Sequence, residues 1–248
     1  MSLIASAPLP ATHWGGPSGI TTFAPEINRV WWVTYLFAIP IGLIVIGLIT
    51  WAVIRWHRRG PDDNRRPRQF QYHIPLEAAY TIIPLVVVAV LFGFMYGVEN
   101  NIIHVKKNPD VKITVQGFQW GWRFTYPNGH QEVGSVAAEP SIEDVQNLPI
   151  LRMPEHETVQ FTLQSDDVNH SFYVPEFLFK RDLIQRVHNV VDVNVTTTGN
   201  YIGECTQLCG TYHAFMRFRL LVMTKSAYNT WYRSTKPNSI TCAGGGNC

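Results

Sequence analysis

Two long apolar stretches dominate the pattern of hydrophobic and polar residues in the N-terminal part of the chain. Residues 30–54 run for 25 positions without a charged side chain, and residues 78–98 do so for 21. Each stretch exceeds the roughly 20 residues that a helix needs to cross a bilayer. A core helix of a soluble protein is usually shorter and is seldom apolar on every face, so the pattern predicts two transmembrane helices.

After about residue 109 the pattern changes to alternating apolar and polar residues, which is typical of strands with one buried face. The alternation runs from Val111 to Tyr126, and its parity shifts near Gly117, which predicts a bulge at the glycine. Short strands with turn signals over about 120 residues favour an antiparallel β-sandwich. Further elements are expected at residues 159–163, 191–195 and 216–222 as strands, and at 226–234 as a closing helix.

The segment between the two apolar stretches is basic. Residues 55–73 hold six arginines against two aspartates. Short positive loops stay in the cytoplasm, so both termini and the strand-rich half are expected on the outer face of the membrane. The position of this run between two spans favours a role in topology over nucleic-acid binding, and no nucleic-acid partner is expected. Only 15% of the residues are charged, and the net charge of +2 says little about partners.

One short segment, residues 203–216, concentrates potential metal ligands: Cys205, Cys209, His213 and Met216. A disulfide between the cysteines and a zinc site are both open alternatives, since zinc-binding cysteines are commonly two to four residues apart. The methionine favours copper, because thiolate, imidazole and a weak thioether form the ligand set of electron-transfer copper sites. One copper needs a single cysteine, so the second cysteine indicates either a spare thiol or two coppers that share both sulfurs. A two-copper site needs a further histidine, which His170 can supply.

Together these residues resemble subunit II of cytochrome c oxidase, over about residues 25–230. The resemblance implies a membrane α + β protein: a two-helix transmembrane hairpin followed by a cupredoxin-like Greek-key β-sandwich with a binuclear copper centre, CuA. The expected organisation is an exported segment 1–29, the membrane hairpin 30–98, the CuA domain 99–230 and a tail 231–248. The implied copper ligands are Cys205 and Cys209 as bridging thiolates, His170 and His213 on one copper each, and Met216 and the main-chain carbonyl of Gln207 as axial ligands.

The same resemblance implies an electron-entry subunit. Trp120 looks like the surface residue that receives electrons, and Glu77 looks like the carboxylate at the cytoplasmic mouth of a proton-uptake path. Asp167 could orient His170 from outside the metal shell. The alternatives are a core tryptophan, a carboxylate that reaches to the membrane interface, and a solvated acid in a turn.

The partners and the chemistry follow from the family. Electrons are expected from cytochrome c or from a haem c-bearing subunit, and they leave to haem in subunit I, where oxygen is reduced to water. The chain itself is therefore expected to hold no catalytic residue for oxygen chemistry. Other oxidase subunits, the lipid membrane and a bacterial plasma-membrane location complete the expectation. A CuA subunit of a nitric-oxide reductase and a membrane-anchored copper chaperone are the alternative functions.

Three local features qualify this picture. Gln207 stands where the family has a glutamate that helps to hold magnesium at the boundary with subunit I; a neutral amide is a poorer ligand, so the magnesium ion is in doubt. The acidic stretch 132–157 is a candidate docking surface for a basic cytochrome, or else an ordinary solvated face. Cys242 and Cys248 flank a glycine-rich stretch, either as a disulfide or as an unpaired tail.

Overall fold

The computed structural model describes residues 16–17, 19–57, 60, 71–136, 145 and 147–243. These residues form two units. One unit contains the chain up to Pro25 and again from Ile102 onward, and the other is Glu26–Asn101. The predicted basic segment 55–73 lies largely outside the described residues.

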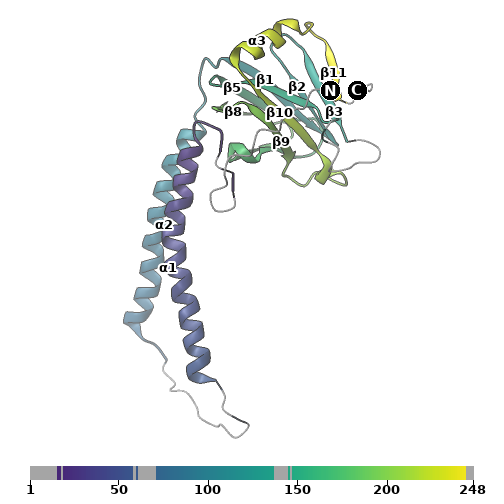
Figure 1. The fold of residues 1–248 in the computed structure, drawn as a ribbon. Coiled ribbons are helices and arrows are strands. Elements are labelled where there is room, and N and C mark those ends of the chain that lie inside the picture. The colour runs from purple at the N-terminus through teal and green to yellow at the C-terminus, as the bar shows by residue number, and fades with distance from the viewer. Residues whose placement is uncertain are drawn as a thin grey trace. The chain divides into compact units, whose positions relative to one another are not determined.

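Two long helices account for the second unit and for the ends that join it to the first. Helix α1 is Ala24–Trp56 and helix α2 is Ile74–Ile102, and Figure 1 shows them side by side. Each extends past both ends of the apolar stretch that predicted it. Their mean hydropathy reaches 2.5 and 2.4, so both have the length and the composition to cross a membrane.

The first turn of α2 is capped by two side chains. The backbone N–H of Leu76 donates to Nδ1 of His73 at 3.3 Å. In return, the backbone N–H of His73 donates to Oε1 of Glu77 at 2.8 Å. Helix N-termini leave backbone donors without partners, and this reciprocal pair satisfies two N–H groups at the start of α2.

The first unit is built from strands. They pack as two sheets with α3 (Lys225–Ser234) at one end and two short 3-10 helices, η1 (Pro175–Phe177) and η2 (His213–Phe215) (Figure 1). The strands are β1 (Val111–Phe118), β2 (Gly121–Thr125), β3 (Gln131–Ser135), β4 (Ile150–Pro154), β5 (Thr158–Ser165), β6 (His170–Val174), β7 (Phe179–Leu183), β8 (Asn189–Asn194), β9 (Gly199–Cys205), β10 (Arg217–Met223) and β11 (Ile240–Cys242).

The strand order confirms the predicted β-sandwich, and α3 confirms the predicted closing helix. One sheet has the order β11-β3-β2-β1-β5-β8 and the other β4-β10-β9-β6-β7. The expectation of purely antiparallel pairing is wrong, because β1 pairs with β5, β10 with β4 and β11 with β3 in parallel. The chain crosses to the second sheet at β4 before it returns at β5, so β5 runs beside β1 in the same direction.

Aromatic side chains fill the space between the sheets. Trp122, Phe124, Phe172 and Phe218 are all fully buried. The Phe218 ring lies 5.2 Å from both Trp122 and Phe172 and 5.3 Å from Phe124. Aromatic contacts of this kind stabilise a pair by about 0.5–1.5 kcal/mol beyond the burial of area. The strands that carry the candidate metal ligands are therefore fixed by a rigid core.

The predicted bulge near Gly117 is wrong. The parity of the pattern shifts because β1 ends at Phe118 and β2 begins at Gly121, so that these two residues face each other across a hairpin. Residues 119 and 120 form the turn between the strands. A hairpin turn and a bulge produce the same change of parity along the sequence.

Both ends of the described chain pack on the sandwich. The backbone N–H of Ile20 donates to Glu176 O at 2.8 Å, and Ile20 O accepts from the N–H of Thr196 at 2.8 Å. At the other end, β11 adds to the sheet beside β3. Cys242 on β11 takes part in a disulfide, and Cys248 lies outside the described residues.

Candidate metal centre

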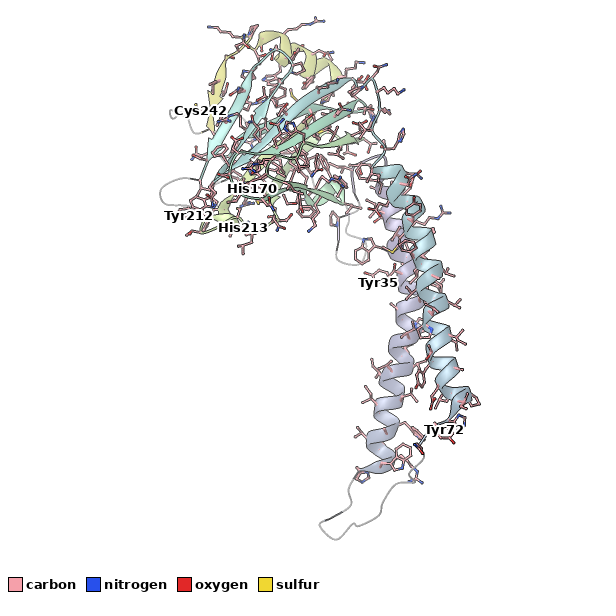
Figure 2. The ribbon with its side chains drawn as sticks, turned by 180° about the vertical axis from the view of Figure 1, so that it is seen from behind. Tyr35, Tyr72, His170, Tyr212, His213 and Cys242 are labelled. Atoms are coloured by element: carbon pink, nitrogen blue, oxygen red, sulfur yellow. The ribbon has the colours of Figure 1, made fainter. Side chains whose placement is uncertain are left out.

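The candidate ligands of residues 205–216 lie on the loop between β9 and β10. Strand β9 ends at Cys205, and β10 begins directly after Met216. The backbone N–H of Cys205 donates to Met216 O at 3.0 Å, which ties the two ends of the loop together. The 3-10 helix η2 within the loop begins at His213. Figure 2 shows His170, Tyr212 and His213 at one end of the sandwich.

The sulfur atoms of the loop converge. Sγ of Cys209 lies 3.8 Å from Sγ of Cys205, 3.8 Å from Sδ of Met216 and 3.5 Å from Nδ1 of His213. Sγ of Cys205 lies 3.2 Å from the carbonyl oxygen of Gln207. Both cysteines are free, and a disulfide would bring the sulfurs to about 2.05 Å. The disulfide alternative is therefore excluded in this structure.

His170 joins the loop from the neighbouring strand. It is the first residue of β6, and its side chain is 0% exposed. Its Nδ1 lies 3.9 Å from Sγ of Cys205. A Cβ on Gly117 of β1 would lie 3.0 Å from Cγ of His170, so a larger residue at position 117 would crowd the imidazole ring. The glycine at the parity shift therefore makes room for this ring.

The donor set fits soft or borderline metal ions. The ligand atoms of His170, Cys205 and Cys209 lie within 4.8 Å of one another. Met216 is buried beside them, and a thioether favours copper over zinc. The structure thus brings together all six residues that the resemblance implied as copper ligands: His170, Cys205, Gln207, Cys209, His213 and Met216.

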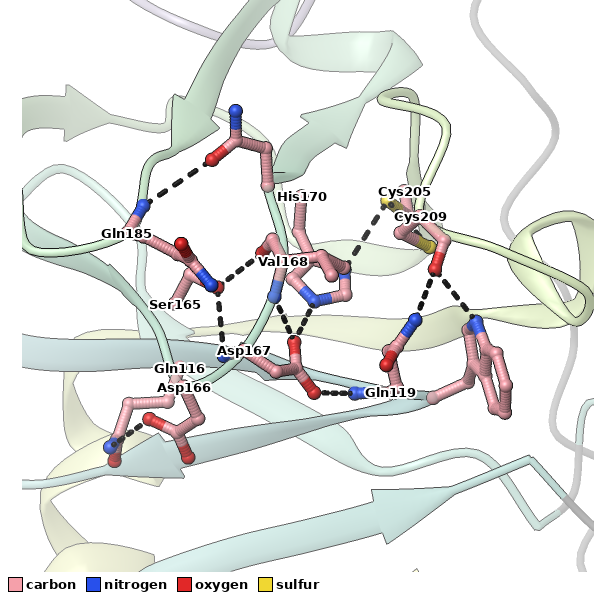
Figure 3. Close-up of polar contacts among 12 residues, drawn as sticks. Gln116, Gln119, Ser165, Asp166, Asp167, Val168, His170, Gln185, Cys205 and Cys209 are labelled. Atoms are coloured by element: carbon pink, nitrogen blue, oxygen red, sulfur yellow. Dashed lines mark hydrogen bonds and ion pairs between the residues drawn. The ribbon is translucent and has the colours of Figure 1, made fainter.

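Asp167 holds the ring of His170 from behind (Figure 3). Its Oδ1 lies 2.8 Å from Nε2 of His170. An imidazole that donates from Nε2 leaves Nδ1 free as an acceptor, and Nδ1 is the atom that faces the thiols. Burial works to raise the pKa of Asp167, but the hydrogen bonds from His170 and from the backbone N–H groups of Gln119 and Val168 outweigh it and hold this pKa below its usual value.

The metal-free site has two thiols of very different acidity. Burial alone would raise the pKa of both. At Cys205 the hydrogen bond with His170 and backbone hydrogen bonds outweigh burial and lower the pKa to about 7. At Cys209 burial and the neighbouring Cys205 raise the pKa to about 12. Burial works to lower the pKa of His170, but hydrogen bonds with Cys205 and Asp167 raise it.

Trp120 lies in the hairpin turn and is hydrogen-bonded to the metal loop. Its indole Nε1–H donates to the carbonyl oxygen of Cys209 at 3.1 Å. The side chain of Gln119 donates to the same oxygen at 2.8 Å. Trp120 is only partly buried, whereas Trp122 is fully buried in the core. One hydrogen-bonded step therefore joins the partly exposed indole to a ligand residue.

The other predicted residues lie elsewhere. Glu77 is in the first turn of α2, within the helical unit, whereas the candidate metal ligands belong to the other unit. Glu132 of the acidic stretch is 5% exposed and forms an ion pair with Arg152. It is therefore not available for docking, because a buried carboxylate needs an internal partner. Residues 137–144 of this stretch lie outside the described residues.

Three residues of the site carry no obvious sequence signal. Gln119 donates to Cys209 O, Gly210 lies against the indole, and the ring of Tyr212 packs on Trp120. Glutamine, glycine and tyrosine are common in turns and on surfaces. Only their positions beside Trp120 and within the Cys-to-Met loop could have indicated a role.

Known proteins are similar to this chain in sequence. A family model described as "Cytochrome C oxidase subunit II, periplasmic domain" matches residues 111–223. The cytochrome c oxidase subunit 2 of Mycobacterium bovis is 32% identical over an alignment of 268 positions, which covers 88% of this chain and 73% of that protein. The subunit 2 of Corynebacterium glutamicum is 32% identical over an alignment of 279 positions, which covers 91% of this chain and 77% of that protein.

Among solved structures, the periplasmic domain of subunit II of cytochrome oxidase of Bradyrhizobium japonicum aligns at 27% identity with a TM-score of 0.46. The alignment covers 52% of this chain and 96% of that domain. The relatives of M. bovis and C. glutamicum match most of this chain and about three quarters of their own length. Their shared length and identity show that the chain belongs to the cytochrome c oxidase subunit II family.

Proposed function

We propose that the protein is the electron-entry subunit of a membrane-bound cytochrome c oxidase and that it holds two copper ions in a CuA-type centre. One observation carries the proposal. Thiolate, imidazole, thioether and carbonyl donors from β6 and from the β9–β10 loop converge at one buried point in a member of this family.

The residues divide naturally between two ions. Cys205 and Cys209 would each hold both ions, while His170 and His213 would each hold one. Met216 and the carbonyl of Gln207 would complete the two sets. When bound, two coppers that share both thiolates delocalise a single electron, so that little nuclear rearrangement accompanies reduction.

The protein's own contribution is to fix these ligands in place and to keep most of them out of contact with water. Cys205 and Cys209 are 5% and 3% exposed, and His170 is fully buried. A copper chaperone needs exchangeable ligands that a partner can reach, so this burial favours a permanent site. Asp167 holds the imidazole of His170 in the tautomer that presents Nδ1 to the metal.

Electrons enter at Trp120 from cytochrome c or from a haem c-bearing subunit, and they leave to haem in subunit I. Support for the entry point comes from the partly exposed indole and from its hydrogen bond to Cys209 O. The two apolar helices anchor the subunit in a bacterial plasma membrane. The basic segment 55–73 then lies on the cytoplasmic side, and the sandwich lies on the outer face.

Two further sites are part of this proposal. Glu77 supplies a carboxylate at the start of α2 for proton uptake into subunit I, where a charged group is costly unless it has a function or a partner. Magnesium at the boundary with subunit I is weakly supported, because Gln207 provides an amide in place of a carboxylate. Copper binding uses only the main chain at this position.

Metal analysis and electron spin resonance of the purified membrane complex test the proposal. We expect two coppers per chain that share one unpaired electron, together with co-purified haem. Cys205→Ser should abolish this signal, while Cys242→Ser, on β11 and outside the site, should preserve it. A single zinc ion, or an unchanged copper content in Cys205→Ser, would contradict the assignment.

A further inference from the structure

The side chain of Trp120 is held by the same loop that carries the metal ligands. The indole Nε1–H and the side-chain amide of Gln119 both donate to Cys209 O, at 3.1 and 2.8 Å. The backbone N–H of Gln119 donates to Oδ2 of Asp167 at 2.6 Å. The turn is therefore attached to both of the segments that supply ligands.

The residue after Cys209 lets the indole approach. Gly210 has φ of +120°, a conformation that L side chains rarely adopt. A Cβ at this position would lie 2.9 Å from Cζ2 of Trp120 and 3.3 Å from its Nε1. The backbone of the metal loop thus lies against one side of the Trp120 indole, and a side chain at position 210 would push the indole away.

The ring of Tyr212 also packs against the indole of Trp120. It meets the indole edge to face, with centroids 5.0 Å apart and an interplanar angle of 85°. This is a preferred geometry for aromatic pairs and favours one arrangement over the alternatives by about two- to tenfold. Tyr212 directly precedes His213, so its backbone is fixed by η2 and by the ligand that η2 carries.

We propose that Tyr212 is a positioning residue for electron entry, which holds the indole of Trp120 against the carbonyl oxygen of Cys209. The inference rests on the proposed function, in which Trp120 receives the electron. In that step one electron leaves the reduced haem of the donor and enters the oxidised metal site. Tyr212 itself exchanges neither an electron nor a proton. Its role is to keep the indole in the orientation that couples it to the ligand loop.

The first test measures electron transfer within a preformed complex. Cytochrome c is bound to the copper-loaded, detergent-solubilised full chain, its haem is photoreduced, and the rate of copper reduction is followed optically. In Tyr212→Ala and Tyr212→Leu we expect this rate to fall about three- to tenfold, because the preferred indole orientation is less populated. Tyr212→Phe keeps the ring and should restore the rate. The affinity for cytochrome c should stay unchanged throughout.

The second test needs no copper. The chain contains eight tryptophans, and 5-fluorotryptophan labelling gives each a fluorine resonance. The resonance of Trp120 is assigned by its loss in Trp120→Phe. In the metal-free protein, Tyr212→Ala should shift or broaden this resonance and leave that of the buried Trp122 in place, which also shows that the variant is folded. Tyr212→Phe should retain the wild-type position.

The outcomes separate this inference from the proposed function. If Trp120→Phe accepts electrons at the wild-type rate, electron entry through Trp120 fails, and the role of Tyr212 fails with it. If Trp120→Phe is slow but Tyr212→Ala is as fast as wild type with an unshifted fluorine resonance, only the positioning role is overturned. A lower affinity for cytochrome c at an unchanged rate also overturns it, because Tyr212 would then act by contacting the donor.

Discussion

Replacement of Asp167 by asparagine is a direct test of how the site is held. Three donors point at this carboxylate: Nε2 of His170 at 2.8 Å, and the backbone N–H groups of Gln119 and Val168, both at 2.6 Å. Asparagine offers one oxygen and an amide that can only donate. The amide must face either the N–H of Gln119 or Nε2 of His170. The first arrangement leaves a donor without an acceptor, and the second forces the proton of His170 onto Nδ1, the atom that faces the metal.

The expected loss follows from the strength of these bonds. A hydrogen bond to a charged group contributes about 1.5–3 kcal/mol, which corresponds to a factor of about 10 to 150 in a binding constant. Loss of a residue that orients a metal ligand typically weakens metal binding by about 10- to 100-fold. We therefore expect Asp167→Asn to weaken copper binding by one to two orders of magnitude, as measured by competition with a chelator on the full chain.

Asp166 provides a matched control at the adjacent position. It is an exposed residue whose carboxylate pairs with Arg123 at 3.3 Å. Exposed ion pairs contribute about 0–1 kcal/mol, so Asp166→Asn should leave the copper affinity within a few-fold of wild type. If both variants bound copper equally well, the hydrogen bond from His170 to Asp167 would have no part in holding the metal, and the reasoning above would be refuted.

Three further predictions concern acidity, stability and proton uptake. In metal-free protein, alkylation of Cys205 should accelerate as the pH rises through about 7, because the thiolate forms there. Cys209, with a pKa of about 12, should stay unreactive below pH 9. Mass spectrometry of the labelled peptides measures both rates, and equal reactivity of the two cysteines would contradict the prediction. Arg152→Met removes the arginine partner of the buried Glu132 and leaves it only the 3.5 Å contact with Nε2 of His130. The loss should cost up to about 3–5 kcal/mol of unfolding free energy without changing the copper absorption, and an unchanged unfolding midpoint would argue against this ion pair. Glu77→Gln keeps an oxygen for the helix cap but cannot carry a proton. Turnover of the whole oxidase should therefore slow while the copper spectrum stays unchanged. Turnover at the wild-type rate would show that Glu77 has no role in proton uptake.

The parts of the structure that depend on local pattern could be predicted from the sequence. An uncharged run of 25 residues has few alternatives to a membrane helix, and the loop from Cys205 to Met216 is short enough for its spacing to indicate one site. His170 is different, because 35 residues separate it from Cys205. It could be assigned only because a two-copper site requires a second imidazole. Its placement on β6, beside β9, is a consequence of strand pairing between distant segments.

Contacts that lie outside the local sequence pattern explain two features that the pattern did not reveal. The change of parity near Gly117 comes from a hairpin, and the glycine is explained by the ring of His170, which packs on it from the other sheet. Glu132 belongs to an acidic stretch in sequence, yet its strand turns it inward to Arg152. Neither packing against a ring nor the inward face of a strand can be read from a short segment of sequence without its partner.

In the proposed function the same contacts serve ligand rigidity and electron entry, and this would explain the placement of the site. His170 and Cys205 lie on adjacent strands of one sheet, where Phe172 pairs in register with Cys205 and packs into the aromatic core. The turn with Trp120 belongs to the other sheet and reaches Cys209 by hydrogen bonds. A centre that must change its charge without moving its ligands needs a packed core beneath it, because close-packed interiors resist displacement. A centre that must receive electrons also needs a path to the surface, and in the proposed function the turn from the opposite sheet supplies one while Cys205, Cys209 and Met216 stay buried.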